Sequence, residues 1–444
     1  MKDLTKGNIY KTFFTFGFPL CLSALLTQIY SFIDTIMAGQ YLGETALGAI
    51  GATAPLVTIL SSIFWGAYSG YSIYIARLFG SGDYKKLKQT AISTLLVFSL
   101  VCLLIALTTV ALCEPIFDLL NIDQKLRTQA KEYYIVYTLG LFMITLGCGL
   151  SSTFHALGVS SFVLLFSIVS SVINIVGNYL SIIVFNWGLI GVAGSSVLSA
   201  LVVNLAYVIK LKKCFTELGV TEKISISLNS VKDTFGYSLP NSFQQISMYI
   251  GTLLLSPLIN KLGVEASASY LVCLKICNLC QDVYVGAAKS ISSYSSQCLG
   301  HNEPEKLKKG LWVGILYNVI YVTPFVLVCI IFYKFVCGLF LTESATPLTI
   351  QYSHEFVKYY LPFLYFHLLT NAFHAFFRGV KAMGHLYFTT TFATVMRYVL
   401  SLILINKLAY TGFYIGWVSS WVLEVMLIFF LYKLGKWKPK LKTA

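Results

Sequence analysis

The sequence has 444 residues, of which 57% are hydrophobic and only 11% are charged. A soluble domain carries about 25% charged residues, so this composition excludes the water-soluble enzyme classes. It predicts a protein that crosses a lipid bilayer several times. The formal net charge of +14 raises the question of nucleic-acid binding. No block of basic residues alternates with stacking aromatic residues, so we expect no nucleic-acid partner.

Charge-free spans separated by helix breakers predict an all-α polytopic membrane protein with twelve transmembrane helices. Turn signals at residues 158–161 and 186–188 divide the longest charge-free stretch, residues 133–209, into three helices. The other nine expected spans are residues 13–37, 45–79, 89–113, 233–260, 266–299, 310–337, 351–378, 385–405 and 411–433.

The longest polar break in the chain, residues 211–232, predicts a cytoplasmic connector. It separates an N-lobe, residues 1–210, from a C-lobe, residues 233–444, that ends in a basic tail. Most lysines and arginines lie at the N-terminus, in alternate loops and in this tail. The opposite loops hold only Lys125, Arg127, Lys131, Lys261, Lys334, Lys358 and Lys407. By the positive-inside rule we expect both termini in the cytoplasm and the protein in the cell (inner or plasma) membrane.

The two halves of the sequence repeat each other at three anchors, which are separated by 221, 220 and 220 residues. This constant offset predicts two six-helix lobes related by a pseudo-two-fold axis along the membrane normal, with a binding site between them. The matched segments are Phe16-Gly17-Phe18-Pro19 with Tyr237-Ser238-Leu239-Pro240, Leu42-Gly43 with Leu262-Gly263, and residues 80–87 with residues 300–307.

Asp34 stands out because it follows a span without any charged residue, where the pattern is still apolar. A carboxylate near the centre of the bilayer costs roughly 2.5 to 3.5 kcal/mol, and chains that keep one usually use it. Pro19, within the same span, removes a backbone donor and offers a place to bend. We interpret Asp34 as functional. The alternative is a carboxylate that a lysine of another helix neutralises.

Together these features resemble the multidrug and toxic compound extrusion (MATE) family of the multidrug/oligosaccharidyl-lipid/polysaccharide exporter superfamily. The resemblance rests on the proline and aspartate of the first span, the Leu-Gly after it and the repeated glycine-rich loop. Phe377-Arg378-Gly379, Arg397 and Gly191-Val192-Ala193-Gly194 agree with it. It implies alternating-access antiport of small organic compounds, driven by H⁺ or Na⁺, by a monomer without a cofactor. The pattern is closer to the DinF-like branch than to the NorM-like branch.

In the DinF-like branch an aspartate of the first helix joins two residues four apart on the fifth and a hydroxyl on the sixth. The matching positions here are Asp34, Asn174, Asn178 and Ser199. Asn178 departs from that pattern, because the branch often has aspartate there. Fewer carboxylates weaken a Na⁺ cage, which favours proton exchange on Asp34, although Na⁺ at Asp34 stays open. Alternatively, the two asparagines make only packing hydrogen bonds.

The NorM-like branch would instead place acids in the 233–260 and 351–378 spans. Here these spans offer amides and histidines, so we expect the only ion site in the N-lobe and a cargo surface in the C-lobe. The expected cargo residues are Gln28, Gln244, Gln245, Lys275, Asn278, His367, Asn371 and His374. His367, Asn371 and His374 form one stripe. Its histidines either take part in proton movement or line a wet cavity.

The 266–299 span carries Lys275, Asp282 and Lys289 on nearly one face. A spare cation there would disfavour cationic cargo, unless Lys289 reaches the membrane surface instead. Glu424, close to two tryptophans, is a second candidate acid.

Three cysteines in the same span share one helical face, but we interpret them as packing residues and expect no metal site. They are Cys273, Cys277 and Cys280.

Two other classes of function are weaker. A flippase for a lipid-linked oligosaccharide would need several arginines along its groove, and the chain has only Arg77, Arg127, Arg378 and Arg397. A membrane enzyme would need clustered catalytic residues at a membrane face, and the six histidines form no such motif. We therefore expect a transporter and not an enzyme.

Overall fold

The computed structural model describes residues 1–120, 122–222, 225–341, 345–435 and 437. This part of the chain is helical and contains no strand, which confirms the all-α prediction. Nine of its helices are long and apolar enough to cross a membrane. One of the nine contains two expected spans, and two further helical segments match the remaining two spans. Each of the twelve predicted spans therefore corresponds to helix.

The chain divides into two compact units. Unit 1 comprises Met1–Asp3 and Leu26–Phe243, and unit 2 comprises Leu4–Leu25 and the chain from Gln244 onward. The boundaries fall inside the helices that begin the two repeats. The units differ from the predicted lobes, residues 1–210 and 233–444. Unit 1 includes the first part of α8, and unit 2 includes the first part of α1. The lobe division stays a prediction of the sequence.

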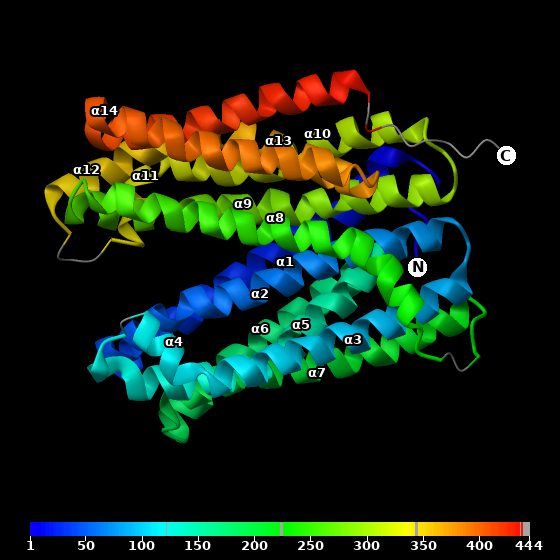
Figure 1. Ribbon diagram of the computed structural model, residues 1–444, viewed down its shortest axis with the longest axis horizontal. Helices are drawn as coiled ribbons and strands as arrows, with labels where there is room; N and C mark the ends of the chain where they lie inside the picture. Colours follow the sequence, from blue (N-terminus) through cyan, green and yellow to red (C-terminus); the bar gives the residue numbers. More distant parts are fainter. Residues whose placement is uncertain (121, 223–224, 342–344, 436, 438–444) are drawn as a thin grey trace. The chain divides into compact units, whose positions relative to one another are not determined.

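Unit 1 contains most of the first repeat (Figure 1). Within it, α5 packs against α2, α3 and α7, and α6 packs against α7. Its elements are the second part of α1 (Ile9–Met37), the π-helical η1 (Ala38–Leu42), α2 (Gly43–Gly80), α3 (Tyr84–Ala111), α4 (Cys113–Leu119), α5 (Gln124–Ala156), α6 (Ser161–Tyr179), the π-helical η2 (Leu180–Val184), α7 (Gly188–Glu217) and the first part of α8 (Leu228–Asn260).

Unit 2 is built around α9, which packs against α10, α12 and α13. An aromatic core that includes Tyr284, Trp417 and Trp421 fills it. Besides the first part of α1 and the rest of α8, its elements are α9 (Val264–Gly300), α10 (Lys306–Ile331), α11 (Tyr333–Gly338), α12 (Pro347–Glu355), the π-helical η3 (Phe356–Tyr360), the 3₁₀-helical η4 (Leu361–Phe363), α13 (Leu364–Gly379) and α14 (Met383–Leu434).

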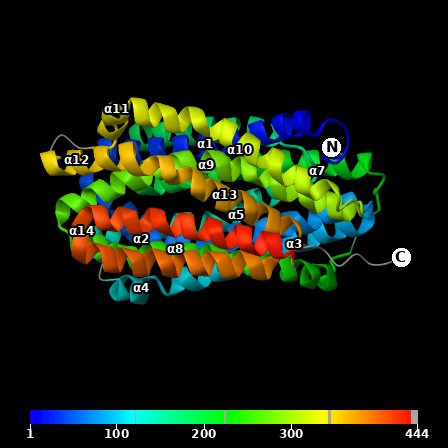
Figure 2. The same cartoon turned by 90° about the horizontal axis from the view of Figure 1, so that it is seen from above.

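The last long helix, α14, contains two of the expected spans. Ala409, with φ 49° and ψ −127°, breaks it into halves that lie side by side (Figure 2). The halves approach closely because Gly412 faces the backbone of Leu404 and Gly416 faces that of Ser401. The break confirms the boundary predicted between residues 405 and 411.

The start of α5 corrects the sequence prediction. Charge placed Lys125, Arg127 and Lys131 in a loop, yet they lie in the first turns of α5. Asp123 caps this helix by accepting a hydrogen bond from the Lys125 backbone N–H at 2.9 Å. Lys131 pairs with Glu114 of α4 at 2.6 Å. A helix can extend beyond the apolar core where its charges find such partners, so charge alone misplaces its end.

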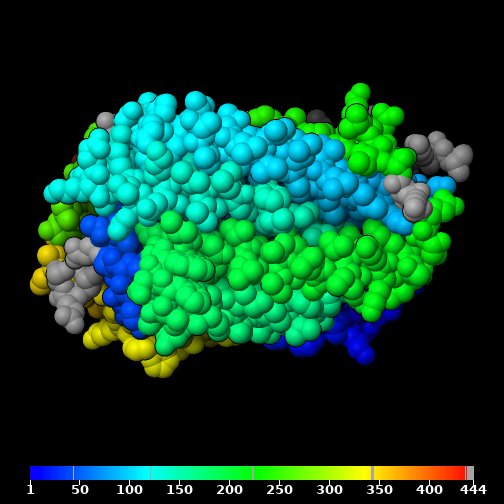
Figure 3. All heavy atoms as spheres, turned by 90° about the horizontal axis from the view of Figure 1, so that it is seen from below, coloured from blue at the N-terminus to red at the C-terminus, as the bar shows by residue number. Residues whose placement is uncertain are grey.

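The apolar outer face of unit 1 is plain on α3. Leu96, Leu100, Leu104 and Leu107 recur every three or four residues and are all exposed. The residues of unit 1 are coloured from blue to green in Figure 3. A stripe of exposed leucines on a membrane protein suits contact with lipid chains. The expected basic tail after α14 lies almost wholly outside the described residues.

The sequence repeat recurs as a repeat of backbone conformation. Gly43 and Gly263 precede the bodies of α2 and α9 with φ of 84° and 105°. Gly82 and Asn302 occupy matching positions before α3 and α10 with φ of 75° and 60°. Glycine and asparagine tolerate this region better than other residues, which explains why these anchors share one offset.

A close helix crossing also occurs twice. A methyl group added at Gly66 of α2 would lie 2.5 Å from Ser242 Cα on α8. At the matching position of α9, a methyl group added at Gly286 would lie 2.7 Å from the Leu20 carbonyl oxygen on α1. The first part of α8 is thus fitted against α2 within unit 1, and the first part of α1 against α9 within unit 2. Small residues permit such approach between membrane helices.

Candidate functional site

Asp34 heads a chain of polar contacts in unit 1. Asn178 Nδ2 donates to Asp34 Oδ1 at 2.5 Å and to Asn174 Oδ1 at 3.4 Å. Asn174 Nδ2 in turn donates to Ser196 Oγ at 3.0 Å. Both asparagines are buried, and Asp34 is half-buried. This series of hydrogen bonds links α1, α6 and α7, so three of the four residues expected at an ion site come together.

The fourth expected residue, Ser199, lies one turn further along α7. Its hydroxyl donates to the Ser196 backbone carbonyl at 2.9 Å. Ser196 supplies the hydroxyl that contacts Asn174 instead. Sequence reasoning missed Ser196, although the serine-rich stretch of α7 contained the signal, because only the packing of α6 on α7 selects one hydroxyl.

Irregular backbone adjoins both key residues of this cluster. Asp34 lies one turn before the π-helical η1, and Asn178 lies just before the π-helical η2. The two π segments are also in contact with each other. Such insertions are rare and occur frequently at functional sites. Neither π segment was predicted from the sequence.

The charge of Asp34 has no basic partner among the described residues, where no lysine, arginine or histidine forms an ion pair with it. It interacts electrostatically with Tyr30 and Tyr137. Asn178 Oδ1 is buried and has no hydrogen-bond partner in the described structure. An ionised acid beside a free amide oxygen can hold a proton on the carboxylate or a small cation between the two groups.

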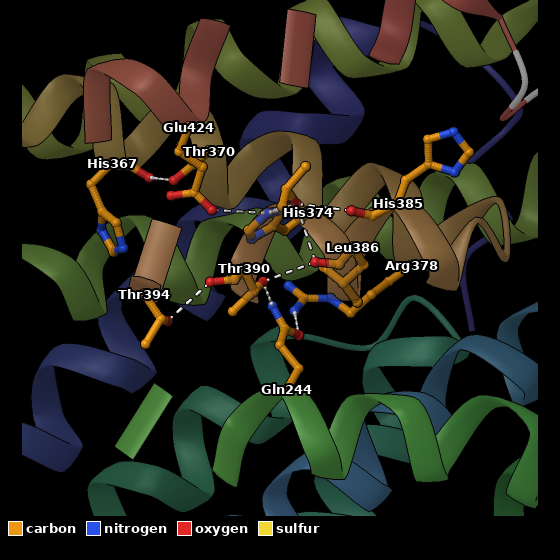
Figure 4. A network of polar contacts seen from close by, with 11 residues as sticks. Gln244, His367, Thr370, His374, Arg378, His385, Leu386, Thr390, Thr394 and Glu424 are labelled. Atoms are coloured by element: carbon orange, nitrogen blue, oxygen red, sulfur yellow. Dashed lines mark hydrogen bonds and ion pairs between the residues drawn. The ribbon is translucent and has the colours of Figure 1, made fainter. Parts of the chain in front are cut away.

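A second polar network occupies unit 2 (Figure 4). Gln244 of α8 donates from Nε2 to Thr390 Oγ1 at 3.2 Å and accepts from Arg378 Nη1 at 3.3 Å. His374 Nε2 lies 2.9 Å from Thr389 Oγ1 and 3.4 Å from Glu424 Oε1. This network joins α8, α13 and both halves of α14.

The predicted stripe on α13 has divided roles. His367 Nδ1 lies 2.5 Å from the Tyr284 hydroxyl, and its ring is 5.3 Å from that of Trp421. His374 contacts Glu424 instead. Between them, Asn371 has a buried Oδ1 without a hydrogen-bond partner in the described structure. The stripe therefore holds two separate histidine environments.

The other predicted cargo residues are not part of this network. Lys275 and Asn278 are exposed on α9, and the Lys275 ammonium lies 5.8 Å from the Phe340 ring centre. Gln28, in unit 1, and Gln245 are half-buried. Lys289 is exposed.

Cys273, Cys277 and Cys280 are all buried. Among the described residues, no group of three or more histidine, cysteine or acidic side chains could hold a metal ion.

The sequence indicated Glu424 as a candidate acid, but it did not indicate His374 as the partner of this acid. The acid and His374 are far apart in the chain, and they meet because the second half of α14 folds back at Ala409. The NorM-like pattern would place acids on the 233–260 and 351–378 spans, which offer amides and histidines here. The structure instead brings the acid from α14 to the histidine of α13.

Comparison with known proteins places this geometry in a family. The MatE family model matches residues 19–180 and 240–403. The probable multidrug resistance protein YoeA of Bacillus subtilis (strain 168) is 24% identical, over 98% of this chain and 96% of YoeA.

Two solved structures share the fold. A multidrug resistance MATE family transporter of the MOP superfamily, in its outward-facing conformation, gives a TM-score of 0.89 at 21% identity over 97% of each chain. A MOP superfamily transporter from Pyrococcus furiosus Vc1 gives a TM-score of 0.89 at 21% identity over 98% of each chain. The family model covers most of both repeats, and the chain therefore belongs to the MatE family of multidrug and toxic compound extrusion transporters.

Proposed function

We propose that this protein is a secondary active antiporter that exports small organic compounds in exchange for a cation. Its family and the multidrug resistance function in the name of its relative YoeA support this proposal. The single observation that carries the coupling is Asp34, an acid within a membrane-spanning helix with no basic partner in the described structure. Alternating access would expose this acid to each side in turn. The protein would act as a monomer in the cell membrane, with cytoplasmic termini and no cofactor.

The coupling ion that fits Asp34 best is a proton. Asn178 presents its amide N–H to the carboxylate and so acts as a donor, not as a cation ligand. A single carboxylate with few oxygen neighbours makes a poor cage for a hard cation. Protonation would remove the uncompensated charge, which is costly inside the membrane. Na⁺ would instead need to recruit the unpartnered Asn178 Oδ1.

Asn174 and Ser196 would hold Asn178 in place. Asn174 accepts from the same Asn178 amide that contacts Asp34, and Ser196 anchors Asn174. Both are therefore positioning residues for the acid, and Ser199 supports the same turn of α7 through its contact with the Ser196 carbonyl.

Cargo selection falls to polar residues that do not touch Asp34. We assign Gln244 first, because its amide is fixed between Arg378 and Thr390 and can exchange these contacts for cargo. The other residues proposed to contact cargo are Gln245, Lys275, Asn278, His367 and Asn371 in unit 2 and Gln28 in unit 1.

Transport by the purified protein in proteoliposomes tests this function. Accumulation of a panel of fluorescent organic cations and anions is followed under an imposed pH gradient without Na⁺, and under an imposed Na⁺ gradient at fixed pH. We expect the pH gradient alone to drive transport. Transport that requires Na⁺ at fixed pH, with no response to a pH gradient, would contradict proton coupling. No gradient-driven transport of any compound would contradict antiport.

A further inference from the structure

Unit 2 contains a buried acid and base in contact, on elements that the Asp34 cluster does not use. Glu424 is 4% exposed and His374 is 6% exposed. Glu424 Oε1 lies 3.4 Å from His374 Nε2 (Figure 4). The acid comes from the second half of α14 and the base from α13. Burial of both groups requires that their charges be balanced or removed.

The hydrogen on His374 Nε2 can be placed from its neighbours. The Thr389 hydroxyl donates to backbone carbonyls of its own helix, at 2.9 Å to His385 and 3.1 Å to Leu386. Its oxygen must therefore accept the 2.9 Å hydrogen bond from His374 Nε2. Nε2 thus carries a hydrogen, which Glu424 Oε1 also attracts. The Glu424 carboxylate and His374 Nδ1 are then the two places where the pair can take up one more proton.

Two arginines interact electrostatically with members of this pair. Arg397, on the first half of α14, interacts electrostatically with Glu424. Arg378 and His367, on α13, interact with His374. On α8 and α9 the nearby groups are Gln244, which is neutral, and Tyr284, which contacts His367.

These neighbours permit two charge states. When Glu424 is ionised, Arg397 balances its charge. When the pair holds an additional proton, its own net charge rises from −1 to zero, and Arg397 keeps a hydrogen bond to the Ser420 hydroxyl at 3.4 Å. An unbalanced buried charge costs several kcal/mol, and neither state has one at Glu424. A group that is stable in both states can load and release a proton.

We propose that Glu424 and His374 form a second proton-binding site, separate from Asp34. Loading adds one proton from water to the Glu424 carboxylate, and release returns it to water, with no other bond made or broken. His374 then acts in proton binding and not in cargo contact. The protein would exchange protons at one acid in each unit, which goes beyond the single coupling acid of the proposed function.

Infrared difference spectroscopy on the full chain in nanodiscs tests this site without any cargo. The C=O stretch of a protonated carboxylic acid is recorded between about pH 5 and about pH 9, a range in which ordinary surface acids stay ionised. The spectrum of each variant is subtracted from that of the unmodified protein. We expect Glu424→Gln to remove one titrating carboxyl band, and Asp34→Asn to remove a different one. Glu305→Gln, at an exposed acid of the same unit, should remove none.

A second variant keeps the proposal testable if Glu424→Gln does not fold. His374→Gln retains the acid and should shift the midpoint of the Glu424 band by about one pH unit, since the nearest titrating partner is lost. The Asp34 band should stay in place. No carboxyl band assigned to Glu424 across the pH range, or a midpoint unchanged by His374→Gln, would overturn the proposal. If the unmodified protein shows the Glu424 band but no titrating band that depends on Asp34, the result would contradict the proposed coupling acid but not this site.

Discussion

The two repeats share features of their backbone conformation but differ in the side chains that could bind ions. Both units use a positive-φ residue at the same turns and a glycine at the same close crossing. At the offset of 221 residues, however, the position that matches Asp34 is Leu255, which is buried. At the offset of 220 residues, Glu424 matches Asn204, a buried amide on α7. Each unit therefore keeps an acid where the other has a neutral residue.

The environments of the two acids differ as well. Asp34 is half-buried and meets an amide, and no basic group pairs with it in the described structure. Glu424 is buried, contacts a histidine and interacts with an arginine. An acid without a basic partner must bind a cation or a proton for its charge to be neutralised. An acid with a basic partner is stabilised in both its ionised and its protonated form. The shared backbone sets where helices cross, and the divergent side chains set what each unit binds.

The largest effect is expected for Asp34→Asn. We expect gradient-driven accumulation to fall to background while the protein stays folded and inserted, because asparagine keeps the shape but cannot exchange a proton. Transport in proteoliposomes and elution of the purified protein on a sizing column are the measurements. Asp118→Asn, at an exposed acid paired with Arg127, serves as the matched control and should transport normally. Normal accumulation by Asp34→Asn would refute the coupling role, and loss of expression alone would indicate a structural role.

The shared crossing can be broken in either unit. Gly66→Ala and Gly286→Ala each place a methyl group within 2.7 Å of backbone atoms, which cannot yield as a flexible side chain would. We expect each to destabilise the protein by about 1–3 kcal/mol or more, measured as a lower Tm in detergent. Gly51→Ala, also on α2 and with no atom within 4 Å, should leave the Tm unchanged. A large effect in one unit only would show that the crossings are not equivalent.

Much of this fold was predictable, because span length and hydrophobicity are local properties and the repeat offset needs no structure. The start of α5 was not, since charges there are satisfied by α4 and not by water. The 351–378 span was predicted as one helix, whereas the structure interrupts it with the π-helical η3 and the 3₁₀-helical η4. Of the site, Asp34 and its two asparagines were predicted. Ser196 and the meeting of His374 with Glu424 depend on how helices pack, which spacing within one helix does not specify.

A substitution at Gln244 in unit 2 should change which compounds are exported. Gln244→Ala removes an amide that contacts both Arg378 and Thr390. We expect the ratio of transport rates for two cargo compounds to change by roughly 5- to 150-fold, since one polar contact discriminates by about 1–3 kcal/mol. The number of ions moved per cargo should stay the same. Uniform loss of all cargo, with altered ion stoichiometry, would mean that Gln244 belongs to coupling. Thr394→Ala is the control, because Thr394 lies on α14 one turn after Thr390 and donates to the Thr390 carbonyl instead of contacting Gln244 or Arg378 in the described structure.

A substitution at Asn178 in unit 1 should change the preference for H⁺ or Na⁺ as the coupling ion. Asn178→Asp places a second carboxylate against Asp34, where like charges cannot both stay ionised without a shared proton or cation. We expect transport at fixed pH to become several-fold more dependent on Na⁺. Asn204→Asp, on α7 and bonded to the Met143 carbonyl instead, should not confer this dependence. If Asn178→Asp leaves the response to Na⁺ unchanged, Asp34 does not share its ion with α6.

The smallest effect separates two serines of α7. Ser196 Oγ accepts from Asn174, whereas Ser199 Oγ donates to a backbone carbonyl that already belongs to its own helix. Ser196→Ala removes the part-buried hydrogen bond from Asn174, a loss of about 0.5–1.5 kcal/mol that would loosen Asn174 and, through it, Asn178. We therefore expect Ser196→Ala to weaken pH-driven transport by about three- to tenfold and Ser199→Ala to have little effect. Initial rates at several pH values measure both variants. The reverse order would restore Ser199 as the coupling hydroxyl, because it would mean that the hydroxyl one turn further along α7 faces the acid during transport.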